Sequence, residues 1–235
     1  MSNLLIVTPT YNEAENISNL VASVFHSNPD AHMLFVDDNS KDGTKELIRE
    51  EMAKRPEQIF ILEREGKLGL GTAYIAGFKW GLGKGYELFQ EMDADLSHDP
   101  KMVPEFLGKL SSHDVVIGSR YVKGGGTKNW GLLRKVISRG GSLYARTILG
   151  LKVKDLTGGY NLWKRNVLEA ISLDDVRSEG YAFQIELKFR AKKRGFQITE
   201  VPILFVDRRA GYSKMSSGIV FEAMLRVLKL RFLVK

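Results

Sequence analysis

The sequence predicts an α/β fold with a mostly parallel central sheet and helices on both faces. Short apolar runs alternate with helical segments through the first half of the chain, as in repeated strand–helix–strand units. The 235 residues are 43% hydrophobic and 27% charged, which suits the core and surface of one large soluble domain. Because the sequence contains no internal repeat, low-complexity tract or linker, we expect one main folded unit.

The first helix is expected to begin at Asn12 as its cap, with Glu13 and Glu15 near its positive N-terminal end. In the second half, the pattern predicts helices over Gly131–Leu149 and Tyr181–Arg194. The predicted strands are Leu4–Thr8, Met33–Val36, Ile59–Leu62, Glu87–Met92, Val115–Gly118 and Phe196–Pro202.

Polar or charged side chains directly follow four of these apolar strands. Ligands of open α/β sheets bind outside the carboxyl ends of the strands, so we expect the four segments to share one edge of the sheet. Ordinary turn chemistry explains any one of them, but it explains all four together poorly. The segments are Pro9–Glu13, Asp37–Asp38, Asp93–Asp95 and Ser119–Tyr121.

Several classes of protein are disfavoured by what the sequence lacks. It has no cysteine, which excludes disulfide frameworks and thiolate metal sites. Met1–Val7 lacks the basic region of a signal peptide, and no stretch approaches the roughly 18 apolar residues of a spanning helix. We therefore expect a cytoplasmic protein that does not cross a membrane by itself. Zinc-ligand spacing, a P-loop, a Rossmann fingerprint after the first strand and a Gly-x-Ser-x-Gly elbow are also missing.

The positive charge of the chain is concentrated in one segment. Residues Arg120–Lys154 contain nine basic side chains and no Asp or Glu, whereas the other 200 positions hold 26 basic and 28 acidic residues. The net charge of +7 therefore comes from this segment. A solvated basic surface would explain such a cluster, but its position favours a local anionic partner.

Asp93 and Asp95, with the small Ala94 between them, suit a hard divalent cation. Mg²⁺ or Mn²⁺ prefers one or two carboxylates together with phosphate oxygens of a substrate. Without a cation the two aspartates would repel a diphosphate, and with one they would hold it. An acidic pair in a turn is common, but this pair follows a strand beside other polar strand ends, which favours a metal and diphosphate site.

Eight blocks run in order along nearly the whole chain: Pro9–Glu13, Val36–Thr44, Gly69–Tyr74, Asp93–His98, Gly118–Tyr121, Asp155–Gly158, Phe205–Arg208 and Gly211–Lys214. Together they resemble the dolichyl-phosphate (polyprenol-phosphate) mannose synthases, which are inverting glycosyltransferases of family 2 with the GT-A fold. Each block alone is moderately specific, whereas the ordered set is strongly specific.

The resemblance implies an enzyme that transfers mannose from GDP-mannose to a polyprenyl (dolichyl) monophosphate with inversion, using Mg²⁺ or Mn²⁺. The products would be polyprenyl β-D-mannosyl phosphate and GDP. The implied catalytic residues are Asp93, Asp95 and Arg120, and the implied metal ligands are Asp93 and Asp95. The implied contacts of the nucleotide sugar are Pro9, Tyr11, Glu13, Val36, Asp38, Asp93, Ala94, Asp95, Arg208 and Lys214. The acceptor phosphate would bind Arg120, Arg134, Ser138 and Arg208.

The residue types suit these implied roles. Arginine presents a planar fork to phosphate, and Arg134 and Ser138 are four apart on one face of their predicted helix. A phosphate monoester is already an anion at neutral pH, so no strong general base is required. One departure is Ser97, which stands where some members have a glutamine as a further metal ligand; Ser97 or a water would replace it.

The chain is expected to comprise a catalytic domain over residues 1–214 and an amphipathic C-terminal helix over residues 215–235. The segment Ile219–Lys235 combines apolar residues with Glu222, Arg226 and Lys229 spaced along one face. Three roles remain open for this helix: contact with the cytoplasmic face of a membrane, packing on the catalytic domain, or docking on a small membrane-embedded partner subunit that the family implies.

Two other functions compete with mannosyl transfer. The first is a polyprenyl-phosphate glycosyltransferase that uses a UDP-sugar such as UDP-glucose, because the sequence separates nucleotide donors poorly. The second is a non-enzymatic nucleic-acid-binding module, suggested by the basic segment. The second leaves the acidic strand ends unexplained, so we expect no nucleic-acid partner.

Overall fold

The computed structural model describes residues 3–206 and 217–233. Its strands are β1 (Leu4–Thr10), β2 (His32–Asp37), β3 (Ile59–Glu63), β4 (Leu88–Glu91), β5 (Val115–Ser119), β6 (Gly126–Lys128), β7 (Asn161–Lys164), β8 (Ile198–Pro202) and β9 (Leu204–Val206). Its α-helices are α1 (Ile17–Ser27), α2 (Thr44–Lys54), α3 (Leu70–Gly83), α4 (Val103–Lys109), α5 (Leu132–Leu149), α6 (Arg165–Ala170), α7 (Gly180–Lys193) and α8 (Ser217–Leu233). Two short 3₁₀ helices are η1 (Pro100–Met102) and η2 (Leu173–Asp175).

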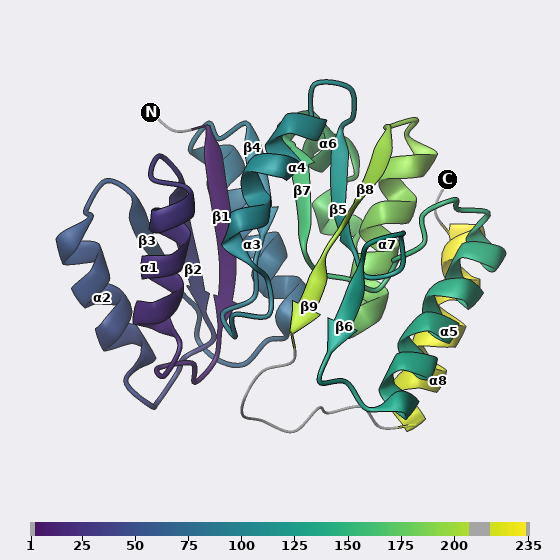
Figure 1. Ribbon diagram of the computed structural model, residues 1–235, viewed down its shortest axis with the longest axis horizontal. Coiled ribbons are helices and arrows are strands. Elements are labelled where there is room, and N and C mark those ends of the chain that lie inside the picture. The colour runs from purple at the N-terminus through teal and green to yellow at the C-terminus, as the bar shows by residue number, and fades with distance from the viewer. Residues whose placement is uncertain (1–2, 207–216, 234–235) are drawn as a thin grey trace.

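A seven-stranded sheet in the order β3-β2-β1-β4-β7-β5-β8 forms the centre of the molecule (Figure 1). All neighbouring strands are parallel except at β7, which runs antiparallel to both β4 and β5. Helices cover both faces, with one hydrophobic cluster beneath α3 and α7 and another beneath α1 and α4. The predicted α/β class and mostly parallel sheet are confirmed. A second small sheet pairs β6 with β9.

The prediction that Asn12 caps the first helix is wrong. α1 begins at Ile17, after a loop in which Asn12 has a left-handed backbone with φ of 57°. The Asn12 N–H donates to Ser40 Oγ at 2.9 Å, so Asn12 links the loop after β1 to the loop after β2. The sequence pattern also missed β6, β7, β9 and α6, which are short elements in the irregular second half of the chain.

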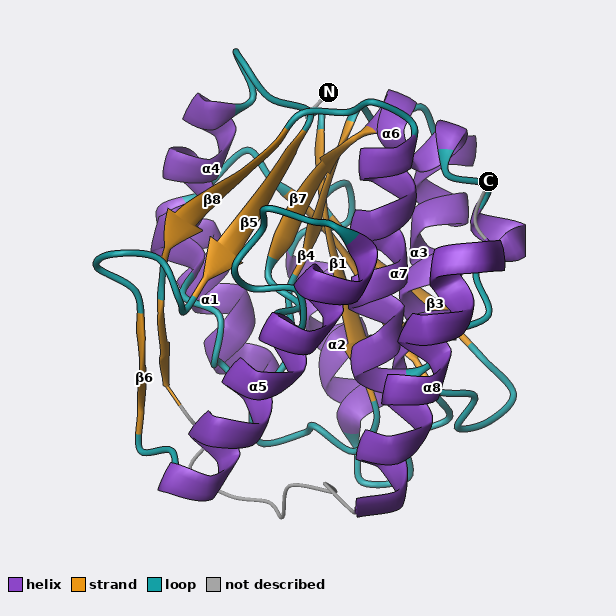
Figure 2. Cartoon of the chain, turned by 90° about the vertical axis from the view of Figure 1, so that its right-hand side faces the viewer, coloured by secondary structure: helices purple, strands orange, loops and turns teal. Residues whose placement is uncertain are grey.

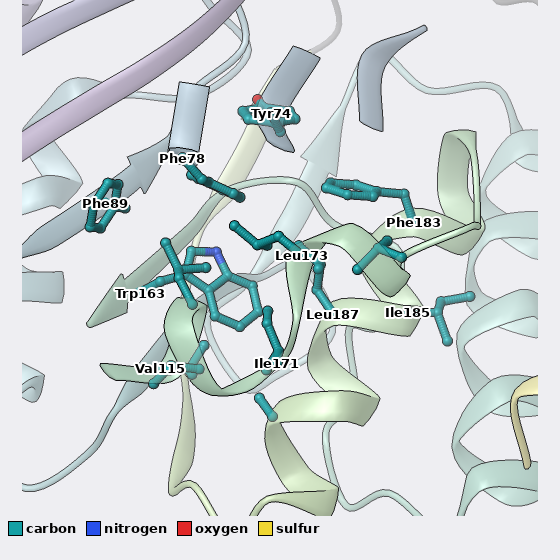
Figure 3. Packing of buried hydrophobic residues seen from close by; sticks show 14 of the residues in the cluster. Tyr74, Phe78, Phe89, Val115, Trp163, Ile171, Leu173, Phe183, Ile185 and Leu187 are labelled. Carbon is teal, nitrogen blue, oxygen red and sulfur yellow. The ribbon is translucent and has the colours of Figure 1, made fainter. Parts of the chain in front are cut away.

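α3 lies unusually close to the sheet because of its glycines. A Cβ atom at Gly77 would be 2.4 Å from Val7 Cγ1 and 3.1 Å from Val36 Cγ2. This approach brings Tyr74 and Phe78 against the aromatic core that also contains Phe89, as Figure 3 shows. The packing therefore sets the height of α3 above the sheet.

Gly77→Ala is expected to destabilise the protein by about 1–3 kcal/mol, because the added methyl group overpacks the contact with Val7 and Val36. The matched control is Gly83→Ala in the same helix, since a Cβ atom there meets nothing within 4 Å. Urea unfolding of both variants measures the difference. Equal stability of the two variants would contradict the packing role of Gly77.

The C-terminal helix α8 packs against the body of the protein. Its Val227 and Leu230 are buried, and the Tyr144 hydroxyl of α5 donates to the Met224 carbonyl at 3.1 Å. Arg226 donates to Ser178 Oγ at 2.9 Å. Figure 2 shows α5 and α8 side by side on the outside of the molecule. No helix in the described ranges is long and apolar enough to span a bilayer. The division at residue 214 stays a prediction.

Candidate functional site

The loop that follows β4 carries Asp93, Ala94 and Asp95 at the carboxyl edge of the sheet. The Tyr74 hydroxyl of α3 donates to Asp93 Oδ1 at 2.8 Å. Burial and the nearby carboxylates raise the pKa of Tyr74 well above its ordinary value, so this donor keeps its proton. Asp95 Oδ1 accepts the Ser97 N–H at 3.1 Å. Both aspartates are thus oriented by bonds to their surroundings.

The surroundings of Asp93 and Asp95 suit a divalent cation held with a diphosphate. The Ser97 hydroxyl is buried and has no hydrogen-bond partner in the part of the chain that is described. This hydroxyl oxygen, two residues beyond Asp95 in the chain, is therefore uncommitted among the described residues. Within residues 3–206 and 217–233, no three His, Asp or Glu side chains gather as a metal cluster. Two carboxylates with substrate phosphate oxygens are the donor set that Mg²⁺ commonly uses.

His98 lies behind the same loop, and the sequence pattern did not single it out for a role. Its Nδ1 accepts the Asp93 N–H at 3.1 Å, and its ring stacks on Tyr160 with centroids 4.6 Å apart. Burial lowers the pKa of His98, although Asp93 and Asp95 act in the opposite direction. The imidazole is therefore a neutral group in a packed position.

The predicted donor-side residues meet where the loops after β1 and β2 touch. Asp37 is fully buried and accepts hydrogen bonds from Thr10 Oγ1 at 3.0 Å and from Ser40 N–H at 2.9 Å. This carboxylate holds the two loops together. Pro9 pairs in register with Val36, whose side chain is buried under α3, so a ligand could meet Val36 only through its backbone. 

Asp38 is paired with Arg64, a residue that the sequence pattern also missed. Arg64 binds Asp38 Oδ1 and donates to Thr72 Oγ1 at 2.9 Å and to the Gly69 carbonyl at 3.2 Å. Arg64 thus connects the end of β2 to the start of α3. Its charge neutralises Asp38, which lowers the repulsion that this carboxylate would exert on a diphosphate.

Tyr11 and Glu13 lie on the outer side of the donor loops. Tyr11 is 39% exposed, and the Lys67 ammonium lies 3.9 Å from the centre of its ring. The Glu13 carboxylate accepts from Asn16 Nδ2 at 2.8 Å, and its N–H donates to Thr44 Oγ1 at 2.8 Å. An exposed aromatic ring beside a cation suits a nucleotide base and its phosphates.

The predicted acceptor residues lie on the other side of the Asp93 loop. Arg120 is almost fully buried and forms a two-pronged ion pair with Asp155, through Nε and Nη2 at 2.7 Å each. Burial alone would raise the pKa of Asp155, but the charge and hydrogen bonds of Arg120 outweigh it and hold that pKa below its ordinary value. Arg120 also donates to Thr157 Oγ1 at 3.0 Å.

Aromatic side chains lie between Arg120 and the two predicted acceptor residues of α5, Arg134 and Ser138. The guanidinium of Arg134 lies 4.1 Å from the Trp130 ring centre, and that of Arg120 lies 5.2 Å from the same centre. The Tyr121 hydroxyl donates to Ser138 Oγ at 2.7 Å. The structure therefore brings the three residues together. Arg208 and Lys214, which were predicted for the same site, lie outside the described residues.

A buried polar cluster behind the site connects β4, β7 and α7. The Glu91 carboxylate accepts from Asn161 Nδ2 at 2.7 Å, Gln184 Nε2 at 2.8 Å and Trp163 Nε1 at 3.2 Å. Burial raises the pKa of Glu91 to about 7. Lys188 donates to the Gly158 carbonyl at 2.6 Å and fixes the loop that carries Asp155. No local sequence signal marks these residues, because they meet only after folding.

A family model described as glycosyl transferase family 2 matches residues 5–172. The chain belongs to this family. It is 46% identical over 224 residues to the polyprenol monophosphomannose synthase of Mycolicibacterium smegmatis, covering 95% of this chain and 84% of that protein. It is also 46% identical over 226 residues to the undecaprenyl-phosphate mannosyltransferase of Micrococcus luteus, covering 96% of this chain and 93% of that protein. The resemblance to polyprenol-phosphate mannose synthases is thus confirmed for this family 2 glycosyltransferase.

The GT-A fold predicted for this family 2 glycosyltransferase is also confirmed. Glucosyl-3-phosphoglycerate synthase from Mycobacterium tuberculosis, solved with Mn²⁺, UDP and glucosyl-3-phosphoglycerate, superposes with a TM-score of 0.70. The match covers 97% of this chain and 79% of that one, at 18% identity. The likeness concerns the fold.

Asp155→Asn is expected to cost about 3–5 kcal/mol of stability at pH 7, because Arg120 would remain buried without its charge partner. The difference in stability between Asp155→Asn and the wild-type protein should shrink as the pH falls below about 4. The folded state lowers the pKa of Asp155, so its ion pair stabilises the fold only at a pH where this carboxyl would be ionised in the unfolded chain. Urea unfolding between pH 3 and pH 7 measures both effects. 

The matched control for this prediction is Asp174→Asn, which breaks the exposed pair with Lys79 and should cost under about 1 kcal/mol. A loss of stability for Asp155→Asn no larger than that of the control would contradict the structural role of the buried pair.

Proposed function

We propose that this chain transfers mannose from GDP-mannose to a polyprenyl monophosphate with inversion, releasing GDP and polyprenyl β-D-mannosyl phosphate. The proposal rests on the 46% identity, over almost the whole chain, to two proteins whose names refer to mannose and to a polyprenyl phosphate. The geometry is consistent with this: one side of the Asp93 loop presents paired carboxylates, and the other side presents arginines. 

In this mechanism the donor would enter between the loops after β1, β2 and β4. Tyr11, Glu13 and the backbone near Pro9, Val36 and Asp38 would hold the nucleotide. Asp93, Ala94 and Asp95 would face the diphosphate, with Asp93 and Asp95 as ligands of Mg²⁺ or Mn²⁺. The bound cation would offset the charge that develops on the departing diphosphate. 

The acceptor phosphate would lie on the side of Arg120, Arg134 and Ser138. The ring of Trp130 lies against both arginines, and its buried indole N–H has no hydrogen-bond partner among the described residues. An acceptor phosphate oxygen would attack C1 of the mannose as the bond from C1 to the diphosphate oxygen breaks on the opposite face. Since the acceptor is already an anion, orientation and cationic stabilisation carry the catalysis. Arg208 and Lys214 would add positive charge over the phosphates.

Transfer of label from GDP-mannose to polyprenyl phosphate, in the presence of Mg²⁺, tests this function. The protein should label the lipid with mannose, and chelation with EDTA should stop the reaction. Asp95→Ala should lower kcat about 100-fold or more, because a group that stabilises the transition state is removed. Asp30→Ala, an exposed carboxylate in the turn before β2, is the control and should keep full activity. 

The same assay with labelled UDP-glucose distinguishes this second candidate donor from GDP-mannose. Transfer from UDP-glucose with none from GDP-mannose would assign the chain to the UDP-sugar alternative. Retained turnover in Asp95→Ala would remove Asp95 from the catalytic site.

We further propose that the protein works as a peripheral protein on the cytoplasmic face of a membrane, where its lipid acceptor lies. The support is an exposed surface on α5 and α8, termed the α5–α8 face. Its apolar members are Leu132, Leu133, Val136 and Leu143 of α5 and Leu225, Leu228 and Phe232 of α8. Leu132 is 78% exposed and Phe232 is 82% exposed, which is unusual for side chains of this size.

Basic residues border this apolar surface. Lys135 and Arg139 lie on the exposed side of α5, and Lys229 and Arg231 lie on the exposed side of α8. The segment that contains α5 has no acidic residue from Arg120 to Lys154. Aliphatic side chains beside lysine and arginine match the interface of a bilayer with anionic lipids. A membrane-embedded partner subunit would be the alternative occupant of this face.

The triple change Leu132→Ser, Leu133→Ser and Val136→Ser is expected to weaken binding to vesicles of mixed phosphatidylcholine and phosphatidylglycerol by about 10-fold or more, since each buried CH₂ group contributes about 0.8 kcal/mol. Vesicle co-sedimentation measures this. Leu204→Ser, on β9, is the control because Leu204 is 58% exposed outside the α5–α8 face. Unchanged vesicle binding by the triple variant would contradict α5 as the membrane contact.

A further inference from the structure

His98 is buried directly behind the loop that carries Asp93 and Asp95, with 2% of its surface exposed. Its ring lies parallel to that of Tyr160, with centroids 4.6 Å apart and planes 7° apart. Its ring also forms a T-shaped contact with Phe205, with centroids 5.7 Å apart and planes at 76°. These contacts fix the orientation of the imidazole ring. Packing alone, however, does not explain why this residue is a histidine.

The end of β4 explains why an imidazole is needed there. The ladder of backbone hydrogen bonds with β1 continues to the Met92 N–H, which donates to the Val7 carbonyl at 3.1 Å. The next N–H, that of Asp93, lies beyond the ladder and needs a different acceptor. His98 Nδ1 supplies it at 3.1 Å. Since Nδ1 accepts, the ring proton lies on Nε2.

The loop curls back on itself to make this contact. Leu96 has a left-handed backbone with φ of 60°, and the Ser97 N–H donates to Asp95 Oδ1 at 3.1 Å. The reversal brings the side chain of residue 98 beneath the main chain of residue 93. The Tyr160 hydroxyl donates to the Asp99 carbonyl at 2.7 Å and holds the outgoing chain in place.

Two hydrogen bonds thus orient Asp93, one to its carboxylate and one to its backbone. Tyr74 donates to its carboxylate at 2.8 Å, and His98 accepts from its backbone. His98 Nε2 is 3.9 Å from Asp93 Oδ2, too far for a hydrogen bond, so the imidazole acts on the main chain of Asp93. 

We propose that His98 is a positioning residue that orients Asp93 for the divalent cation through its Nδ1 acceptor, without touching the cation itself. This rests on the proposed role of Asp93 as a metal ligand. Groups that orient metal ligands from behind commonly change metal affinity 10–100-fold when they are removed. His98 would thereby set how tightly the cation binds with the nucleotide diphosphate.

Two substitutions separate the hydrogen bond from the packing. His98→Phe keeps a ring against Tyr160 but leaves the Asp93 N–H without its acceptor. His98→Asn loses the ring, but its amide oxygen can take the place of Nδ1. Mn²⁺ binding in the presence of GDP, followed by electron paramagnetic resonance, is the readout, with thermal melting to verify the fold of each variant. 

We expect His98→Phe to bind Mn²⁺ about 10-fold or more weakly, and His98→Asn to stay close to the wild-type protein despite a lower melting temperature. In steady-state kinetics, His98→Phe should need a higher Mn²⁺ concentration for half-maximal activity, and His98→Asn should need a concentration close to that of the wild-type protein. Tyr160→Phe, which keeps the stack and removes only the hydroxyl bond to Asp99, should weaken Mn²⁺ binding less than His98→Phe does. If His98→Phe does not fold, the comparison of His98→Asn with His98→Ala provides the same contrast.

Asp93→Asn distinguishes failure of this inference from failure of the proposed metal site. If Asp93→Asn leaves Mn²⁺ binding unchanged, Asp93 is not a ligand and the proposed site is wrong. If Asp93→Asn weakens binding but the variants lacking the acceptor do not, His98 has no positioning role. Equal weakening in the Phe and Asn variants would show that an acceptor at residue 98 does not preserve Mn²⁺ binding, and it would likewise overturn the proposal.

Discussion

The buried ion pair between Arg120 and Asp155 holds together the acceptor side of the molecule. Asp155 receives hydrogen bonds from the Arg120 backbone and side chain and from the Gly158 N–H, which ties the end of β5 to the loop before β7. Arg120 reaches onward to Thr157, whose hydroxyl lies 3.3 Å from Ser142 Oγ on α5. Two charges taken out of water must be paired, so neither loop can move without exposing one of them. 

The same constraint divides the carboxylates at the edge of the sheet into two groups. Asp37, Asp38 and Asp155 are buried and already satisfied, by Thr10 and Ser40, by Arg64, and by Arg120 respectively. Their role is to fix loops. Asp93 and Asp95 belong to the other group: they are half-buried, and Tyr74, His98 and Ser97 orient them. In the proposed function they would hold a cation together with a nucleotide diphosphate.

In the proposed function, the phosphate of a lipid acceptor would explain why the positive charge gathers where it does. The guanidinium groups of Arg120 and Arg134 both lie against the ring of Trp130, and the exposed apolar and basic residues that α5 contributes to the α5–α8 face lie on the same helix as Arg134. In the proposed function, one helix would thus contact the bilayer along its outer side and the acceptor phosphate along its inner side. This arrangement would keep the polar head of the lipid near the edge of the sheet while the chain stays in the membrane.

Most of the fold could be predicted from local sequence, because apolar runs of strand length and helical segments are local patterns. The strand-end rule then placed Asp93, Asp95 and Arg120 on one edge. The short strands β6, β7 and β9 could not be predicted, since their pairing depends on distant segments; β7, for example, forms only between β4 and β5. Asn12 has the sequence context of a cap but serves as a link between loops, because Ser40 approaches it only after folding.

The sequence by itself determined the α/β class, the acidic loop, the concentration of positive charge and the family. The tertiary structure alone decided which of the charged residues are committed to one another. Arg64, Tyr74 and His98 lie 26, 19 and 5 residues from the aspartates that they hold. Tyr74 and His98 belong to blocks of the family resemblance, but no local pattern shows which group each of the three would contact. Their roles arise because buried polar groups must find partners, and the chain fold decides which partners are within reach.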